Sequence, residues 1–371
     1  MVLLQNTGAV LPLEPSAIKS IAVIGPFADD KRVLLGPWVF VHDLESTVSV
    51  LEGVQRLAGD AVQIHHAVGV QKPKRNFPSM FEMFKPKAPA APFDEAAELA
   101  RALEIARASD VVLLVLGEAE DMNGEVASRS TLEIPGRQLE LLEAVAQTGT
   151  PIVLVLLGGR PLDLRGVIQK VPAILMAWHP GSEGGLAVAN LLFGKATPGG
   201  KLPFTWPRSV GQVPMVYSHL RSHQPGMQSK RYWEEESTPL FPFGFGLTYG
   251  SLEYSNLKLN ASSTSIGIAT DETLHVTVDL RNTSKRALEE VAQLYIHQRY
   301  GRAARPVREL KAFERVRLEA GETRTLQFEL PASARRYWSS TDKAYVLDAS
   351  TFDLWIGGDC TATLGAEFTV K

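Results

Sequence analysis

Short apolar runs alternate with amphipathic helical runs over roughly the first 205 residues, and this alternation restricts the fold more than any other feature of the sequence. The apolar runs are rich in β-branched residues, as expected of strands buried on both faces of a parallel sheet. They cover residues 20–25, 62–68, 111–116, 152–157 and 173–178, and the helical runs cover 47–57, 93–108, 138–147 and 183–193. Such an order is typical of βαβ units. We therefore predict an α/β sandwich domain with a mainly parallel sheet over residues 1–205.

After residue 250 the pattern changes to short runs in which apolar and polar residues alternate. Four such runs lie at residues 274–280, 291–296, 325–330 and 352–356. A period of two is typical of strands with one buried face. We predict an all-β sandwich of about seven strands, a fibronectin type III-like immunoglobulin fold, over residues 251–371. Residues 206–250 are predicted to form an ordered connector, because they are rich in Pro, Gly and aromatics but too apolar for a disordered linker.

Composition and charge exclude several classes of protein. A net charge of −3 without a dense basic block argues against nucleic acid as the main partner. No apolar run approaches the roughly 18 residues needed to cross a bilayer, so we expect no membrane span. The eight histidines lack metal-ligand spacing, and the single cysteine, Cys360, cannot form an intramolecular disulfide. We therefore expect no structural metal.

Two motifs that would indicate other chemistries are incomplete. The turn after the first apolar run has Pro26 and Ala28 in the middle of what would be the glycine-rich fingerprint of a dinucleotide site. The turn after the fifth run has Pro180 two residues before Ser182, where the nucleophile elbow of a serine hydrolase requires glycine. We instead predict Ser182 as the N-cap of the following helix.

An acidic loop, residues 117–130, directly follows the third apolar run. Ligands of open α/β sheets gather at the carboxyl ends of strands, so this loop is a candidate catalytic segment, and the alternative is a solvated acidic turn. A general acid needs a raised pKa, from partial burial or a second carboxylate. Glu125 fits best, because it lies deep in a loop of small residues that can deliver it to a ligand. Glu118 abuts the strand end and is expected to be held structurally, and Arg129 is expected to orient the loop.

The order of motifs resembles the carboxyl-terminal two-thirds of family 3 glycoside hydrolases of the bacterial β-glucosidase type. The resemblance covers essentially the whole chain and rests on residues 3–6, 11–13, 21–26, 36–38, 117–118 with Glu125 and 128–129, 159–162, 181–185, 199–203, 242–249, 305–307 and 310–313. It implies a three-domain enzyme without a cofactor, made of an amino-terminal TIM-like barrel, an α/β sandwich and a fibronectin III-like domain. This chain is similar to the last two domains.

The resemblance also implies the chemistry of the site. Family members hydrolyse terminal β-D-glycosides with retention, through a barrel aspartate as nucleophile and a sandwich glutamate as general acid/base, which falls on Glu125. The expected ligands are β-linked glucosides or oligosaccharides, with Trp38 as a stacking platform on the aglycone side; the alternative is that Trp38 plugs a core edge. Two departures concern this site: Thr131 stands where relatives commonly carry Asp, and Pro37 stands where a small residue is usual.

These implications lead to expectations about the chain as a whole. We expect it to be inactive alone and to need a barrel domain or subunit, and we expect its barrel-facing surface to be apolar and to favour a homo-oligomer. A rival interpretation is a non-catalytic carbohydrate-binding or scaffolding module, and a third is an artefactual fragment with Met1 as an internal start. Because Met1 is not followed by a basic leader and a long apolar core, we expect no signal peptide, and localisation stays open between bacterial periplasm and cytoplasm.

Overall fold

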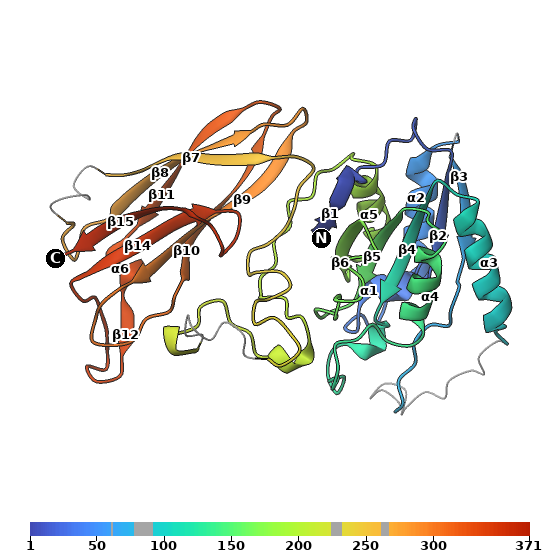
Figure 1. Ribbon diagram of the computed structural model, residues 1–371, viewed down its shortest axis with the longest axis horizontal. Coiled ribbons are helices and arrows are strands. Elements are labelled where there is room, and N and C mark those ends of the chain that lie inside the picture. The colour runs from blue at the N-terminus through green and yellow to red at the C-terminus, as the bar shows by residue number, and fades with distance from the viewer. Residues whose placement is uncertain (61, 78–91, 224–231, 261–266) are drawn as a thin grey trace. The chain divides into compact units, whose positions relative to one another are not determined.

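The computed structural model describes residues 1–60, 62–77, 92–223, 232–260 and 267–371, so part of the predicted connector 206–250 lies outside the described residues. The chain forms two compact units (Figure 1). One comprises Met1–Pro198 and Arg208–Val213, and the other comprises Gly199–Pro207 and Pro214–Lys371. The domain limits taken from the sequence stay predictions, and each unit is described by itself.

A six-stranded sheet forms the centre of the first unit, in the order β1-β6-β5-β4-β2-β3. Its strands are β1 (Val2–Asn6), β2 (Ser20–Ile24), β3 (Gln63–Ala67), β4 (Val111–Gly117), β5 (Ile152–Leu157) and β6 (Ala173–Trp178). Neighbours from β3 across to β6 pair in parallel, and β1 pairs antiparallel with β6. The predicted mainly parallel sheet is confirmed. β1 is a strand that the alternation did not indicate.

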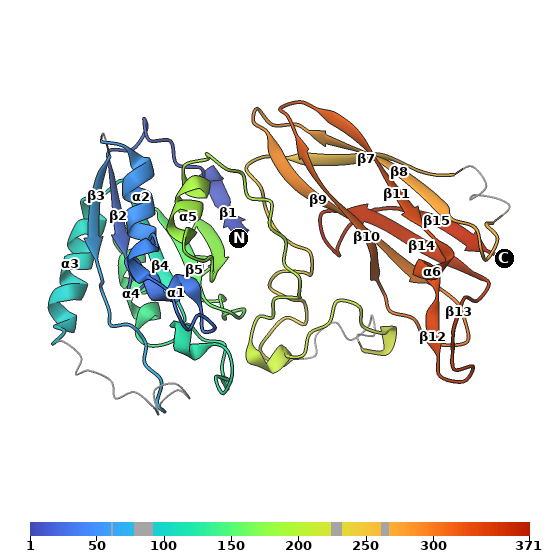
Figure 2. The same cartoon turned by 180° about the vertical axis from the view of Figure 1, so that it is seen from behind.

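Helices cover both faces of this sheet (Figures 1 and 2). They are α1 (Lys31–Leu35), α2 (Val50–Ala58), α3 (Glu95–Arg107), α4 (Gln138–Ala146) and α5 (Gly184–Leu192). α2 packs on α5, and α3 packs on α4. The first pair approaches closely because both helices carry glycine at the contact: a Cβ added to Gly53 would lie 2.2 Å from the carbonyl oxygen of Gly185. Short 3-10 turns lie at η1 (Thr7–Ala9), η2 (Leu44–Ser46), η4 (Glu120–Met122), η5 (Val210–Gln212) and η6 (Arg221–His223).

The start of α5 differs from the prediction. Glu183, not Ser182, is the N-cap, and no side chain caps this end of the helix. The reason is the turn at Gly181, which has φ 92° and accepts a hydrogen bond from the amide of Gly184 at 2.9 Å. This turn carries the chain one residue further before helical geometry begins. The prediction of Ser182 as the N-cap was therefore wrong.

The second unit contains two antiparallel sheets in the orders β10-β9-β14-β15 and β11-β8-β7, with a separate hairpin β12-β13. The elements are β7 (Leu252–Leu259), β8 (Leu274–Asn282), β9 (Leu288–Gln298), β10 (Glu309–Leu318), β11 (Thr323–Leu330), α6 (Ala332–Arg335), β12 (Tyr337–Ser339), β13 (Ala344–Val346), β14 (Ser350–Gly357) and β15 (Leu364–Val370). Burial alternates along β8, as the sequence pattern predicts, and the buried faces form one core. Phe352 and Phe368 stack there with ring centroids 5.0 Å apart. The predicted fibronectin type III-like sandwich is confirmed.

The described helices are all too short or too polar to span a lipid bilayer.

Candidate active site

The candidate loop leaves the sheet at Gly117, the last residue of β4. Gly117 has φ 142°, and a Cβ added to it would lie 1.8 Å from the carbonyl oxygen of Leu157 on β5, so only glycine fits. The fully buried Gln138 then fixes the exit of the strand. Its side chain accepts a hydrogen bond from the Gly117 amide at 2.9 Å and donates to the carbonyl oxygens of Gly117 and Pro135, each at 2.7 Å. The backbone direction at the base of the loop is thereby set by three hydrogen bonds.

Glu118, the next residue, is completely buried and charged groups surround its carboxylate. Its Oε1 accepts a hydrogen bond from Arg129 Nη1 at 2.9 Å. Its Oε2 lies 3.3 Å from Arg160 Nε, an ion-pair distance without hydrogen-bond geometry. Gly158 packs behind it, since a Cβ there would lie 3.3 Å from the Glu118 side chain. Glu118 thus joins β4 to both arginines from inside the unit.

The loop has two limbs, one before its tip (residues 118–122) and one after it (residues 126–130), and two arginines each bind both limbs. Arg160 Nη2 donates to the carbonyl oxygens of Met122 at 2.7 Å and Ala127 at 3.1 Å. Arg75 donates through Nη1 to Asp121 O at 3.1 Å and through Nη2 to Val126 O at 2.6 Å. The segment from residue 122 to residue 126 therefore projects as a closed turn.

Glu125 lies at the tip of this turn and is exposed. It is flanked by Gly124, with φ 88°, and Val126, with φ 55°. The described residues offer its carboxylate no hydrogen bond or ion pair. The described part of this chain therefore does not provide the partial burial that the sequence argument required of a general acid.

Trp38 reaches the same turn from the segment that follows α1. A Cβ added to Gly124 would lie 3.3 Å from Trp38 Cζ2 and 3.1 Å from Pro37 Cβ, so the indole lies against the residue that precedes Glu125. Trp38 is 53% exposed and makes an edge contact with Phe40, whose ring centroid is 6.4 Å away. The alternative that Trp38 plugs a core edge does not agree with this exposure.

Lys72 is a charged residue near the loop that sequence reasoning missed. Its Nζ lies 2.6 Å from Asp30 Oδ2 and 2.8 Å from Glu120 Oε2, and 5.9 Å from the ring centroid of Phe27. Burial lowers the pKa of Lys72, but the carboxylates of Asp30 and Glu120 outweigh burial and raise it above its usual value. Lys72 therefore stays charged and links the start of η4 to the N-cap of α1.

His179 also lies near this end of the sheet, directly after β6. Its Nδ1 donates to the carbonyl oxygen of Val33 at 2.8 Å, so the neutral ring has its lone pair on Nε2. That Nε2 is buried and has no hydrogen-bond partner among the described residues. Burial lowers the pKa of His179, and the hydrogen bond to Val33 and the negative charges of Glu118 and Glu120 only partly oppose this shift.

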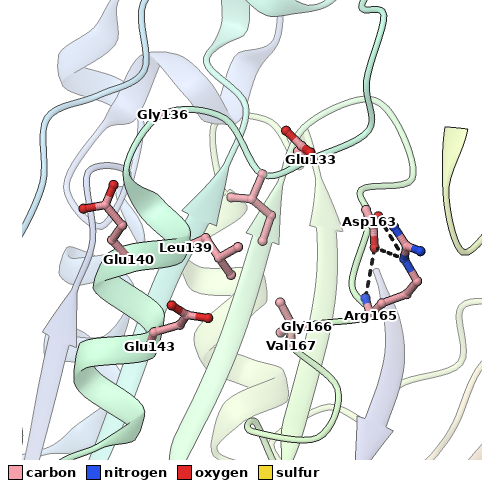
Figure 3. Close-up of a pocket in the computed structure, with 10 residues that line it drawn as sticks. Glu133, Gly136, Leu139, Glu140, Glu143, Asp163, Arg165, Gly166 and Val167 are labelled. Carbon is pink, nitrogen blue, oxygen red and sulfur yellow. Dashed lines mark hydrogen bonds and ion pairs between the residues drawn. The ribbon is translucent and has the colours of Figure 1, made fainter.

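Two cavities lie near the loop in the first unit. One, of about 500 Å³, is lined by Arg75 and Phe77 and by loop residues that include Met122 and Arg129. The other, of about 540 Å³, lies beside α4 (Figure 3): Leu139 and Val167 form part of its wall, and Glu133, Glu140 and Glu143 lie around it. Neither Glu125 nor Trp38 lines either cavity. Among the described residues, no group of three or more His, Cys, Asp or Glu is arranged to hold a metal ion.

The sequence matches the glycosyl hydrolase family 3 C-terminal domain over residues 1–249 and the fibronectin type III-like domain over residues 290–360. The chain belongs to glycosyl hydrolase family 3. The resemblance stated from the sequence motifs is thus confirmed, as are the two fold classes.

Named relatives of this family 3 chain extend beyond it. It is 37% identical to a periplasmic β-glucosidase of Salmonella typhimurium, over 99% of this chain and 48% of the relative. It is 36% identical to a β-xylosidase of Formosa agariphila, over 98% of this chain and 47% of the relative. The crystal structure of a Listeria innocua β-glucosidase in complex with glucose superposes with a TM-score of 0.86 at 30% identity, over all of this chain and 48% of the other. The chain therefore spans about half the length of the relatives it matches.

Proposed function

We propose that this chain supplies the acid/base half of a retaining β-glucosidase-like exo-glycosidase, with Glu125 as the acid/base. The observation that carries the proposal is the presentation of Glu125: an exposed carboxylate at the tip of a turn whose two limbs are bound by arginines. A solvated acidic turn would not need such support. The relatives' additional length leaves room for a barrel domain that carries the nucleophile.

In this mechanism two carboxyl groups from different domains act on the same glycosidic bond. Glu125 protonates the glycosidic oxygen while the barrel aspartate attacks the anomeric carbon, which forms a covalent glycosyl-enzyme. Glu125, now a carboxylate, then removes a proton from water as the water attacks that carbon and releases the sugar. Retention requires the two carboxyl groups to lie about 5–5.5 Å apart, so the turn has to reach into the barrel's sugar pocket. Trp38, beside the turn, would stack on the leaving group, while Glu118 and Arg129 support the turn.

The test combines the purified chain with a separately produced family 3 barrel and measures hydrolysis of an aryl β-glucoside. We expect turnover only with both parts, a loss of about 10²-fold or more in Glu125→Gln, and no loss in the matched control Glu133→Gln, whose carboxylate is also exposed. Azide should restore turnover of an activated glucoside by Glu125→Ala, because azide attacks the glycosyl-enzyme without base assistance and yields a glycosyl azide. Turnover by the chain alone, or an unaffected Glu125→Gln, would contradict the proposal.

A non-catalytic carbohydrate-binding module is the second candidate, because Trp38 and the 70% exposed Phe40 form an accessible aromatic pair. Calorimetric titration of the chain with β-linked glucooligosaccharides distinguishes the two. Saturable binding that Trp38→Ala abolishes, together with no turnover when the barrel is added, would favour the module. Restored turnover that depends on Glu125 would exclude it.

A further inference from the structure

We propose that Arg75 is a positioning residue for the acid/base, which holds the turn that presents Glu125 in a single conformation; this inference rests on the proposed function. Arg75 belongs to the segment after β3 and is far from the loop in sequence. Its guanidinium bridges the two limbs, from Asp121 O at 3.1 Å to Val126 O at 2.6 Å. A planar guanidinium donates in two fixed directions, so it fixes the separation of the two carbonyl groups it binds.

The order of the strands explains why this support is needed in addition to Arg160. β4, which leads into the loop, has β5 on one side and β2 then β3 on the other. Arg160 follows β5 and binds Met122 O and Ala127 O. Arg75 follows β3 and binds the adjacent pair of carbonyl groups. The loop is therefore held by groups that follow strands on both sides of β4.

The backbone at Val126 supplies a second, independent observation. Val126 has φ 55°, a left-handed conformation that is a genuine outlier for a β-branched residue, and its side chain is 70% exposed. Core packing of its own side chain therefore does not impose the conformation. A residue keeps such a strained backbone conformation only where contacts with the surrounding structure hold it there, and strained residues of this kind cluster at functional sites. Here Arg75 binds the carbonyl of Val126, and Arg160 binds the carbonyl of the next residue.

Loss of Arg75 is expected to change the orientation of the Glu125 side chain and to leave the carboxyl group itself unchanged. Without the bridge to Val126 O, the residue after Glu125 is free to return to right-handed space, which turns the peptide that joins it to Glu125. A general acid acts only within hydrogen-bond reach of the oxygen it protonates. Loss of Arg75 is thus expected to impair proton donation while it leaves binding of the sugar and attack by the nucleophile in place.

The first test uses the chain alone and does not depend on activity. Backbone amide order parameters for residues 124–127 are measured by nuclear magnetic resonance in the wild type, Arg75→Gln, Arg75→Lys and the control Arg101→Gln. Arg101 is a suitable control because its Nη2 donates to a carbonyl of the same unit, His66 O at 2.9 Å, outside the loop. We expect order parameters to fall from about 0.85 to below about 0.6 in Arg75→Gln only, with Arg75→Lys intermediate because an ammonium is a single point donor.

The second test uses the chain paired with the barrel and two glucosides that differ in their need for acid assistance. For a glucoside with a poor leaving group, we expect kcat/KM to fall about tenfold or more in Arg75→Gln. For a dinitrophenyl glucoside, whose departure needs no proton, we expect kcat/KM to be unchanged. A merely structural role would lower both values together. Equal losses on the two glucosides, or unchanged order parameters, would overturn the inference. Failure of the wild-type pair to turn over would overturn the proposed function, while the order parameters would still decide whether Arg75 holds the turn in a single conformation.

Discussion

Glu118 and Arg129 form a 2.9 Å ion pair in which the carboxylate is completely buried and the arginine is only 18% exposed. Arg160 Nε lies on the other side of the same carboxylate at 3.3 Å. Removal of the negative charge leaves two guanidinium groups beside a neutral side chain. We expect Glu118→Gln to lower the free energy of unfolding by about 3 kcal/mol, the lower end of the range for broken buried pairs, because both arginines keep some contact with water.

Urea denaturation at neutral pH measures this effect. Glu133→Gln is the matched control, since it also removes a carboxylate near the loop but an exposed one, and we expect a change within about 0.5 kcal/mol. Equal stabilities of Glu118→Gln and the control would show that the buried ion pair makes no net contribution.

Gln138 allows the same kind of test as Glu118, but for the hydrogen bonds of a buried side chain that carries no charge. Leucine at this position would fill a similar volume but remove all three hydrogen bonds to Gly117 and Pro135, and the amide and carbonyl groups of Gly117 would stay buried. We expect Gln138→Leu to lower the free energy of unfolding by about 3 kcal/mol. Thr148→Val is a control on a partly buried hydroxyl at the other end of α4, with an expected loss of about 1 kcal/mol. A loss no larger in Gln138→Leu than in this control would contradict the assigned role.

Much of the fold followed from patterns that are local in sequence. Four of the five apolar runs correspond to β2, β4, β5 and β6, because a strand buried on both faces has to be apolar at nearly every position. The remaining run corresponds to β3, which lies at the sheet edge and is only partly buried. Three of the alternating runs after residue 250 correspond to β8, β11 and β14, in which mainly one face is buried. The fourth lies in β9, which is buried on both faces over most of its length. β1 escaped prediction because Val2–Asn6 is short and lies at the sheet edge, where its pairing depends on β6. α1 escaped because it has only five residues, too few for a periodic pattern.

The candidate site was less accessible to sequence reasoning. Glu118, Glu125 and Arg129 lie in one loop, so their proximity could be inferred from the chain itself. Arg75 contacts the loop across more than forty residues of sequence, and nothing in its neighbourhood distinguishes it from a solvated arginine. Arg160 lay within a family motif, but the residue types in the loop did not indicate that it binds the carbonyl oxygens of Met122 and Ala127. Contacts made to backbone atoms leave no sequence signal at the accepting end.

Strain at Val126 gives a prediction in which a substitution stabilises the protein. A left-handed conformation costs an ordinary residue about 1–2 kcal/mol, and asparagine tolerates it better. We expect Val126→Asn to raise the free energy of unfolding by about 1 kcal/mol, while Val126→Ala, which keeps the Cβ that causes the strain, changes it by less. Urea denaturation of the three proteins measures this difference. A destabilising effect of Val126→Asn would mean that contacts of the valine side chain outweigh the backbone strain.

The buried ring of His179 makes stability depend on pH. Burial lowers the pKa of this histidine in the folded protein, whereas an unfolded histidine titrates near about 6.5. Between these two values the unfolded chain binds a proton that the folded chain does not, so this contribution to stability is complete above about pH 6.5 and is lost as pH falls toward the folded pKa.

The variant His179→Asn tests this dependence. Asparagine retains a donor near the Nδ1 position, which bonds to Val33 O at 2.8 Å, but does not titrate. We therefore expect the stability of the wild type relative to His179→Asn to decrease from pH 7 to pH 5, as measured by urea denaturation at each pH. A constant difference for His179→Asn would show that the ring is protonated equally in the folded and unfolded states.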